Sequence, residues 1–201
     1  MSRQLFLLGQ SGLAREMAEL LAVCDPDARW RFAGMLSASD QSRVLDEDCD
    51  VLLAMGHPQI RRVVAAALSE VSAARWPTLV HPRSDVSRSA LLGAGTVIAS
   101  GALVSTSAQV GAHCLVNYGV TIGHDATIGQ YSVVNPNASV SGGVVIGEAC
   151  LVGAGATILE NVTIGEGVVV GAGAVVLKNV PTGQTVVGVP ARAVRNDGEG
   201  L

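Results

Sequence analysis

The chain has 201 residues, of which 49% are apolar, and a formal net charge of −4. This length allows one domain or two small ones, and with no basic run the sequence implies no nucleic acid partner. There is no signal peptide pattern and no run of eighteen apolar residues, so we expect a cytoplasmic protein without membrane insertion.

Residues 4–8 are apolar enough for a short buried strand, and the residues after them predict a helix. Leu13, Met17, Leu20 and Leu21 recur at helical spacing. The turn between strand and helix consists of Gly9, Gln10, Ser11 and Gly12. In such a turn the backbone N–H groups at the start of the helix can hold a phosphate, although the turn falls short of a full GxGxxG motif and also suits a tight connection without a ligand.

Two further strands are predicted at residues 32–36 and 50–56, and a helix follows. Its expected apolar face is Ile60, Val63, Val64, Ala67, Leu68 and Val71. Strands alternating with helices indicate a small parallel sheet, a Rossmann-like unit. His57 follows the third strand at the sheet edge where such folds place ligands. Arg61 and Arg62 come next, either to meet a phosphate or to lie solvated on the surface.

Residues 76–82 predict a last strand and a linker, which divides the chain into domains 1–80 and 81–201. From Val86 onward an aliphatic residue recurs at every sixth position. The series comprises Val86, Leu92, Ile98, Val104, Val110, Val116, Ile122, Ile128, Val134, Val140, Ile146, Val152, Ile158, Ile164, Val170 and Val176. A period this short is typical of a solenoid of short strands and not of a helical repeat.

The other positions of the six-residue unit are also patterned. A small or β-branched residue stands four places after each aliphatic, and the tight turns need residues that tolerate positive φ. Three units close one triangular coil of eighteen residues, with the aliphatic side chains inside and coils about 4.8 Å apart. The repeat predicts a little over five coils of parallel β-helix. No insertion interrupts it, so a pocket must lie between domains or between subunits.

This repeat resembles that of the hexapeptide-repeat acyltransferases. Residues 117–125 (NYGVTIGHD) and 186–192 (VVGVPAR), together with the amino-terminal half, are similar to sugar acetyltransferases of the bacillosamine N-acetyltransferase and sialic acid O-acetyltransferase type. The resemblance implies a left-handed β-helix, a homotrimer with active sites between subunits, acetyl-CoA as co-substrate, and an amino-terminal domain that binds a nucleotide-linked sugar.

His124 and Asp125 are the predicted catalytic residues. Acetyl transfer to an amine or hydroxyl requires a base as the nucleophile attacks, and imidazole titrates near neutrality. A neighbouring carboxylate can fix the imidazole tautomer. Adjacent strand residues point to opposite faces, so the pair must lie at a corner of the solenoid. His113 has no such companions and is expected to be solvated.

Other site residues follow from coil stacking and from the resemblance. Gly142 and Gly143 lie one coil above His124 and Asp125, where a backbone N–H could support an oxyanion. The resemblance makes Asn117 a substrate contact, although a left-handed corner is an equally good role for it, and it brings Lys178 and Arg192 near the phosphates of coenzyme A. It also marks a departure: Val133 stands where the family often has a second histidine that touches the donor.

The four cysteines show no metal-binding spacing. Cys114 and Cys150 fall in the small-residue position, which indicates packed thiols, and we expect no metal. The sequence therefore predicts acetyl-CoA-dependent N-acetylation of a nucleotide-linked amino sugar. The alternatives are O-acetylation of sialic acid or another sugar and a non-catalytic assembly or binding protein. A β-helix carbonic anhydrase would need three histidines at coil spacing, which the chain does not supply.

Overall fold

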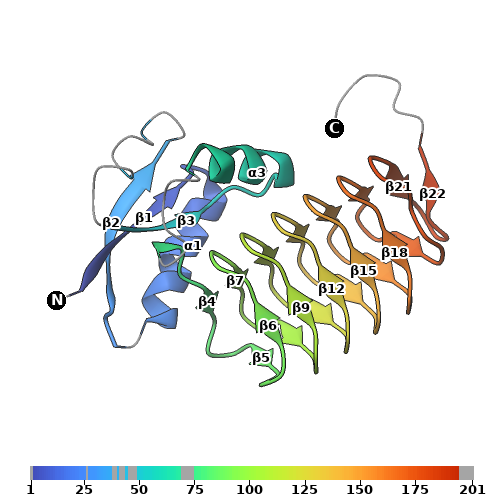
Figure 1. The fold of residues 1–201 in the computed structure, drawn as a ribbon, viewed down its shortest axis with the longest axis horizontal. Helices are drawn as coiled ribbons and strands as arrows, with labels where there is room; N and C mark the ends of the chain where they lie inside the picture. Colours follow the sequence, from blue (N-terminus) through green and yellow to red (C-terminus); the bar gives the residue numbers. More distant parts are fainter. Residues whose placement is uncertain are drawn as a thin grey trace.

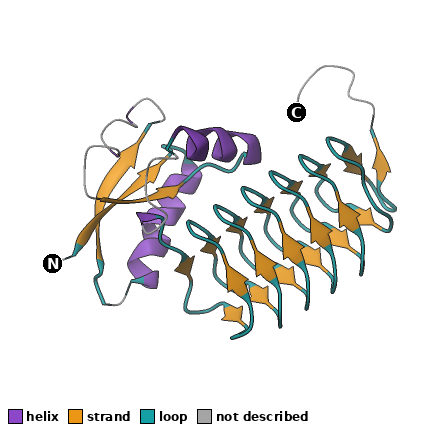
Figure 2. Ribbon diagram, viewed as in Figure 1, coloured by secondary structure: helices purple, strands orange, loops and turns teal. Residues whose placement is uncertain are grey.

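A computed structural model describes residues 2–25, 27–37, 40, 44, 49–68 and 75–194 of the chain. It consists of a small α/β unit at the amino terminus and a long solenoid that runs away from it (Figure 1). The described helices belong to the amino-terminal unit, and short strands line every side of the solenoid (Figure 2). Within the described residues, no helix is long and apolar enough to cross a membrane.

The amino-terminal unit is a three-stranded parallel sheet in the order β2-β1-β3. Its elements in chain order are β1 (Arg3–Leu8), α1 (Gly12–Cys24), β2 (Trp30–Leu36), β3 (Cys49–Leu53) and α3 (Pro58–Ala67). Leu5, Leu7 and Leu8 are fully buried, so the apolar run that predicts the central strand does form it. The predicted parallel sheet is confirmed, whereas nucleotide binding by this unit stays a prediction.

The predicted apolar face of α3 is wrong in part. Ile60, Val63 and Ala67 are exposed, while the buried face is formed by Pro58, Arg61, Val64 and Ala65, with Leu68 just beyond the helix. The helix turns this mixed face inward because it packs on a seam that contains backbone carbonyl groups as well as apolar side chains. Val71, which was assigned to the same face, lies outside the described residues.

The solenoid has three flat sides, each a parallel sheet of two- or three-residue strands. One sheet begins with β4 (Leu79–Val80), β7 (Val97–Ile98), β10 (Leu115–Val116), β13 (Val133–Val134), β16 (Leu151–Val152), β19 (Val169–Val170) and β21 (Thr185–Val187), and ends with the antiparallel β22 (Arg192–Ala193). The second holds β5 (Asp85–Val86), β8 (Leu103–Val104), β11 (Thr121–Ile122), β14 (Ser139–Val140), β17 (Thr157–Ile158) and β20 (Val175–Val176). The third holds β6 (Leu91–Leu92), β9 (Gln109–Val110), β12 (Thr127–Ile128), β15 (Val145–Ile146) and β18 (Thr163–Ile164).

The strand register confirms the eighteen-residue coil. Thr121 pairs with Ser139 and Thr127 pairs with Val145 in the next coil. The predicted aliphatic column fills the interior: its members from Ile98 to Val176 are buried, and Val86 and Leu92 at the open end are partly buried. Because β4 pairs with β7, the solenoid begins before Val86, at residues that the sequence pattern placed in the preceding strand and linker.

The amino-terminal unit is docked on the first sheet of the solenoid. Met17, Leu20 and Leu21 of α1 join one buried cluster with Val97, Leu115 and Val133, which point outward from β7, β10 and β13. On the other side of the small sheet α3 lies along a row of solenoid corners, and Arg62 forms an ion pair there with Glu166. Burial of apolar surface against the solenoid therefore fixes where the small sheet can place a ligand.

Candidate active site

His124 and Asp125 lie together at one corner of the solenoid, in residues 123–126 between β11 and β12. The distance from His124 Nδ1 to Asp125 Oδ2 is 2.8 Å. Because an ionised carboxylate can only accept hydrogen bonds, Nδ1 must carry the hydrogen, and Nε2 is left as the basic nitrogen. The side chains are 69% and 66% exposed in the single chain, so solvent and substrates can reach them.

The corner explains how two adjacent residues can contact each other. Asp125 has φ of 59°, in the left-handed region where the chain turns, and Asp tolerates this conformation better than most residues. In a regular strand the two side chains would point to opposite faces. The prediction that the pair lies at a corner is confirmed by the geometry, while its catalytic role stays a proposal.

Gly142 covers the imidazole of His124 from the next coil. Gly143 N–H donates to the His124 carbonyl over 2.9 Å, which fixes the stacking that the eighteen-residue period predicts. A Cβ on Gly142 would lie 2.6 Å from both Cε1 and Nε2 of His124, so only glycine leaves room for the ring. In the described part of the chain the Gly142 N–H has no hydrogen-bond acceptor, which makes it a free donor beside the basic nitrogen.

A second candidate region is a cavity of about 390 Å³ between the amino-terminal unit and the solenoid. Its lining residues are Gly12, Leu13, Glu16, Gly56, Leu115, Asn117, Tyr118, Asn135 and Pro136. The two halves of the chain thus form one wall each. This location agrees with the prediction that a pocket must lie between domains or between subunits.

Asn117 lines this cavity, and the alternative role as a left-handed corner is wrong for it. The residue with positive φ at that corner is Gly119, and Asn117 uses its side-chain oxygen to accept the Tyr118 N–H over 2.9 Å. Asn135, one coil above, lines the same cavity. The two amide side chains therefore form a polar edge on the solenoid wall.

The predicted phosphate turn contributes to the opposite wall. Gly9 has φ of 135°, and a Cβ there would lie 2.4 Å from the Ala54 carbonyl oxygen, so glycine allows β1 to pass close to β3. Gln10 and Ser11 are exposed, and Gly12 at the start of α1 reaches the cavity. His57 is the exposed N-cap residue of α3 and lies next to Gly56, although it does not line the cavity itself.

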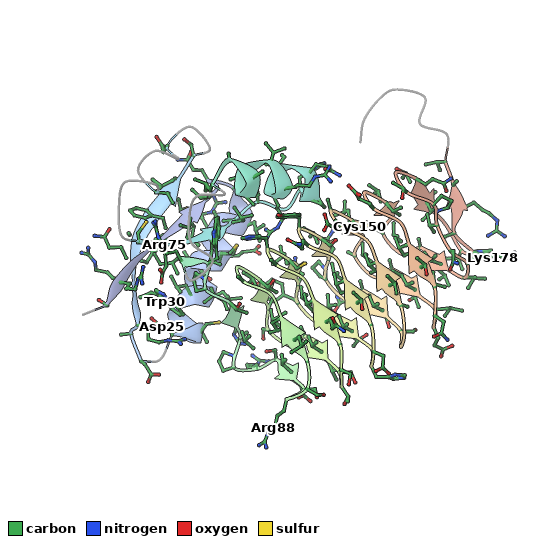
Figure 3. All side chains as sticks on the ribbon, in the orientation of Figure 1. Asp25, Trp30, Arg75, Arg88, Cys150 and Lys178 are labelled. Atoms are coloured by element: carbon green, nitrogen blue, oxygen red, sulfur yellow. The ribbon has the colours of Figure 1, made fainter. Side chains whose placement is uncertain are left out.

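Lys178 and Arg192 line one cavity of about 320 Å³ at the carboxyl end of the solenoid. Lys178 projects from this end, far from the amino-terminal unit (Figure 3). Lys178 also follows His124 by three coils of eighteen residues, so the two lie in the same corner column, about 14 Å apart along the axis at the usual strand spacing. Lys178 and Arg192 therefore line the same cavity, at a fixed distance from His124 along the solenoid axis.

The structure changes the interpretation of two neighbouring residues, and the expectation for one of them, His113, is wrong. His113 is not solvated: its ring stacks on Tyr131 at 5.6 Å between centroids and meets the edge of Trp76 at 4.6 Å, and burial lowers its pKa to about 4. Val133 is fully buried under the amino-terminal unit. The side chain at that position therefore packs against the amino-terminal unit and does not face solvent.

The cysteines are packed thiols, as predicted. Cys114 and Cys150 are buried and each donates to a backbone carbonyl of the next coil. Burial raises the pKa of Cys114 to about 12 and that of Cys150 to about 11, so neither forms a nucleophilic thiolate near neutral pH. Across the described residues, no cluster of three or more His, Cys, Asp or Glu side chains could hold a metal ion.

The sequence reasoning missed several residues of the cavity and of its support. Glu16 could have been found, since it lies four places after Gly12 and therefore on the same face of α1. Tyr118 and Asn135 flank residues already singled out. Arg61 gave no such signal: its guanidinium is fully buried and donates to carbonyl groups, so neither predicted role, phosphate contact or solvated surface, is correct.

Comparison with known proteins finds acetyltransferases among the solved structures that this chain resembles. Residues 143–178 match the model of bacterial transferase hexapeptide repeats. No curated protein matches the chain in sequence. The acetyltransferase domain of PglB from Neisseria gonorrhoeae, solved with acetyl coenzyme A, is 29% identical, with a TM-score of 0.83 over 96% of this chain and 100% of that one.

Two further structures share the fold. PerB from Caulobacter crescentus, solved with CoA and GDP-perosamine, is 24% identical with a TM-score of 0.87, over 96% of this chain and 97% of that one. WeeI from Acinetobacter baumannii is 24% identical with a TM-score of 0.81, over 94% and 99%. The solenoid is thus a left-handed parallel β-helix of about 6 turns, and the resemblance to hexapeptide-repeat sugar acetyltransferases is confirmed.

Proposed function

We propose that the protein is an acetyl-CoA-dependent N-acetyltransferase that acts on the amino group of a nucleotide-linked amino sugar. The observation that carries this proposal is the hydrogen-bonded His124–Asp125 pair, exposed at a corner directly beneath Gly142. Among the structural relatives, the PglB domain was solved with acetyl coenzyme A, and PerB was solved with CoA and an amino sugar linked to GDP.

The chemistry is a direct attack of the amine on the thioester. The amine nitrogen bonds to the acetyl carbonyl carbon while Nε2 of His124 takes one of its protons, and Asp125 stabilises the imidazolium. The carbonyl oxygen becomes an oxyanion, which the free Gly142 N–H can stabilise. The C–S bond then breaks, and the imidazolium returns its proton to the leaving thiolate. No covalent acetyl-enzyme is needed, because the buried cysteines offer no nucleophile at this corner.

The corner column accounts for donor binding. With the thioester at Gly142, the pantetheine arm runs up the column toward the cavity lined by Lys178 and Arg192. The spacing of about 14 Å between His124 and Lys178, three strand spacings, is one that this arm can bridge. Both cations suit the phosphates of coenzyme A.

The cavity between the domains accounts for acceptor binding. Gly12 at the start of α1 offers backbone N–H groups to the diphosphate of the nucleotide. Glu16 alone is charged among the described lining residues. A carboxylate attracts the ammonium form of an amino sugar, and free sialic acid has no cationic group to offer it, which favours the amino sugar over the alternative acceptor.

The two parts of the site belong to different corners. Asn117 and His124 stand at neighbouring corners of one coil, separated by the side that contains β11, or roughly 15–20 Å at the rise of a β-strand. Transfer therefore requires the donor corner of one copy to face the acceptor cavity of another. A closed homotrimer brings the two together and gives three equivalent sites.

An acceptor panel tests the proposed function. Release of thiol from acetyl-CoA is measured with a UDP-linked 4-amino sugar, its GDP-linked counterpart and free sialic acid. We expect turnover with one nucleotide-linked amino sugar and none with sialic acid. Turnover with sialic acid alone would contradict the role of the amino-terminal unit, and a protein that neither turns over nor binds any of these compounds would be a non-catalytic assembly protein.

A further inference from the structure

Arg61 is the largest fully buried side chain of the chain's described part, and it lies where the two domains meet. Its Nε and Nη2 atoms donate to the His113 carbonyl over 2.8 and 2.7 Å. Its Nη1 atom donates to the carbonyls of Leu53 and Met55 over 3.1 and 2.9 Å. One guanidinium thus joins the end of β3 to a corner of the solenoid.

Burying a charged guanidinium where two domains meet costs free energy. No carboxylate pairs with Arg61 among the described residues, and burial lowers the pKa of its guanidinium to about 10. Apolar packing already joins α1 to the solenoid, so a buried charge is not needed to hold the two domains together. What the guanidinium adds is direction, because its planar fork fixes the position of each carbonyl that it binds.

The three carbonyls lie beside the two walls of the cavity between the domains. Met55 immediately precedes Gly56, which lines the cavity from the amino-terminal unit. His113 precedes Leu115 by two residues, and Leu115 and Asn117 line the cavity from the solenoid. A change in the bonds of Arg61 therefore moves one wall relative to the other.

We propose that Arg61 is a positioning residue for the acceptor, which sets the separation and register of these two walls. This inference rests on the proposed function, since it takes the cavity as the acceptor site. A nucleotide alone contacts the wall of the amino-terminal unit, whereas a complete nucleotide-linked sugar spans both walls. Loss of Arg61 therefore weakens binding of the complete acceptor and spares the nucleotide.

The test compares Arg61→Lys and Arg61→Met with the wild type. Two quantities are measured: the Kd of the free nucleoside diphosphate, UDP or GDP according to the acceptor that the wild type uses, and the KM of the complete acceptor. We expect Arg61→Met to raise the acceptor KM at least about 10-fold while the nucleotide Kd and the acetyl-CoA KM stay within about 2-fold. Arg61→Lys keeps the charge but not the fork, so its acceptor KM lies between those of Arg61→Met and the wild type.

Arg62→Ala is the matched control, because it removes the adjacent arginine and its exposed ion pair with Glu166. It leaves both constants unchanged. If nucleotide and acceptor binding weaken together in the Arg61 variants, or if neither changes, Arg61 belongs to the fold alone and the inference is wrong. A wild type that neither binds the nucleotide nor uses the acceptor would instead overturn the proposed function.

Discussion

At the scale of single residues, the candidate active site at His124 depends on the absence of a side chain at Gly142. Along the corner column, Thr106 lies one coil below His124 and Glu160 lies two coils above, while Gly142 between them has no side chain. The gap holds the edge of the imidazole and leaves one backbone N–H unbonded. A glycine beside a basic nitrogen is thus a steric requirement of the site and not only a consequence of the turn.

Gly142→Ala should damage catalysis more than folding. The new methyl group would lie 2.6 Å from Nε2, so the ring must rotate away and its bond to Asp125 is lost. We expect kcat to fall at least about 10-fold, since general base catalysis typically contributes about 10² to 10⁴. Steady-state rates and the melting temperature are both measured.

Gly155→Ala serves as the control, because a Cβ there meets nothing within 4 Å. Gly155 has positive φ and Gly142 does not, so the control carries the larger backbone strain of the two. Gly155→Ala therefore reports the stability cost of a methyl group at a corner without a catalytic effect. Equal losses of kcat in the two variants would contradict the steric role of Gly142.

Part of this site could be predicted from the sequence, for a physical reason. The eighteen-residue period alone places Gly142 over His124 and Lys178 in the same column, since every coil repeats the one before. Arg61 and His113 could not be predicted, because their contacts join segments 52 residues apart that share no periodic relation. The conformation of Asn117 stayed open, because the period gives the corner but not which of its residues takes positive φ.

At the scale of elements, the seam between α3 and the solenoid is the least regular part of the fold. There Trp76 and His113 meet edge to face and Tyr131 stacks on His113, whose Nδ1 atom is buried without a hydrogen-bond partner in the described residues. The sequence period predicts the solenoid strands but not this seam. The face of α3 was predicted wrongly in part for the same reason, since Arg61 binds carbonyl groups at this seam, while Val64 and Ala65 pack on the apolar small sheet.

His113 should make the seam sensitive to acid. Its pKa is lowered from 6.5 to about 4, first by burial and then by the nearby Arg61 charge. Below pH 6.5 the unfolded chain binds a proton that the native state excludes, so stability falls as the pH falls from about 6.5 toward 4. We expect His113→Phe, which keeps the aromatic stack, to gain roughly 1–2 kcal/mol relative to the wild type at pH 4.5, after allowance for partial exposure.

Melting temperatures of both proteins between pH 7.5 and 4.5 provide this comparison. The carboxylates titrate equally in the two proteins, so only the difference between the two curves reports His113. A constant difference across this pH range would show that His113 does not titrate as its surroundings imply.

At the scale of the whole molecule, the solenoid separates the donor and acceptor regions. The cavity that we assign to the acceptor lies where the amino-terminal unit covers the first sheet, and His124 lies at the next corner. Neither region is complete in one chain under the proposed mechanism. The regular stacking of coils lets a neighbouring copy present its His124 corner to the cavity at a matching height.

The most direct test mixes two inactive variants in one oligomer. His124→Ala removes the base, and Gly12→Phe fills the acceptor cavity, where a Cβ on Gly12 meets only the end of the Arg15 side chain. Each variant alone should lose about 10²-fold or more of its activity. The two are co-expressed with different tags, and oligomers that carry both tags are purified.

In a trimer that contains both variants, one site combines an intact His124 with an intact cavity. We therefore predict that the doubly tagged protein releases thiol from acetyl-CoA at about a third of the wild-type rate. Mixed oligomers as inactive as the separate variants would contradict the claim that His124 of one copy acts on an acceptor held by another.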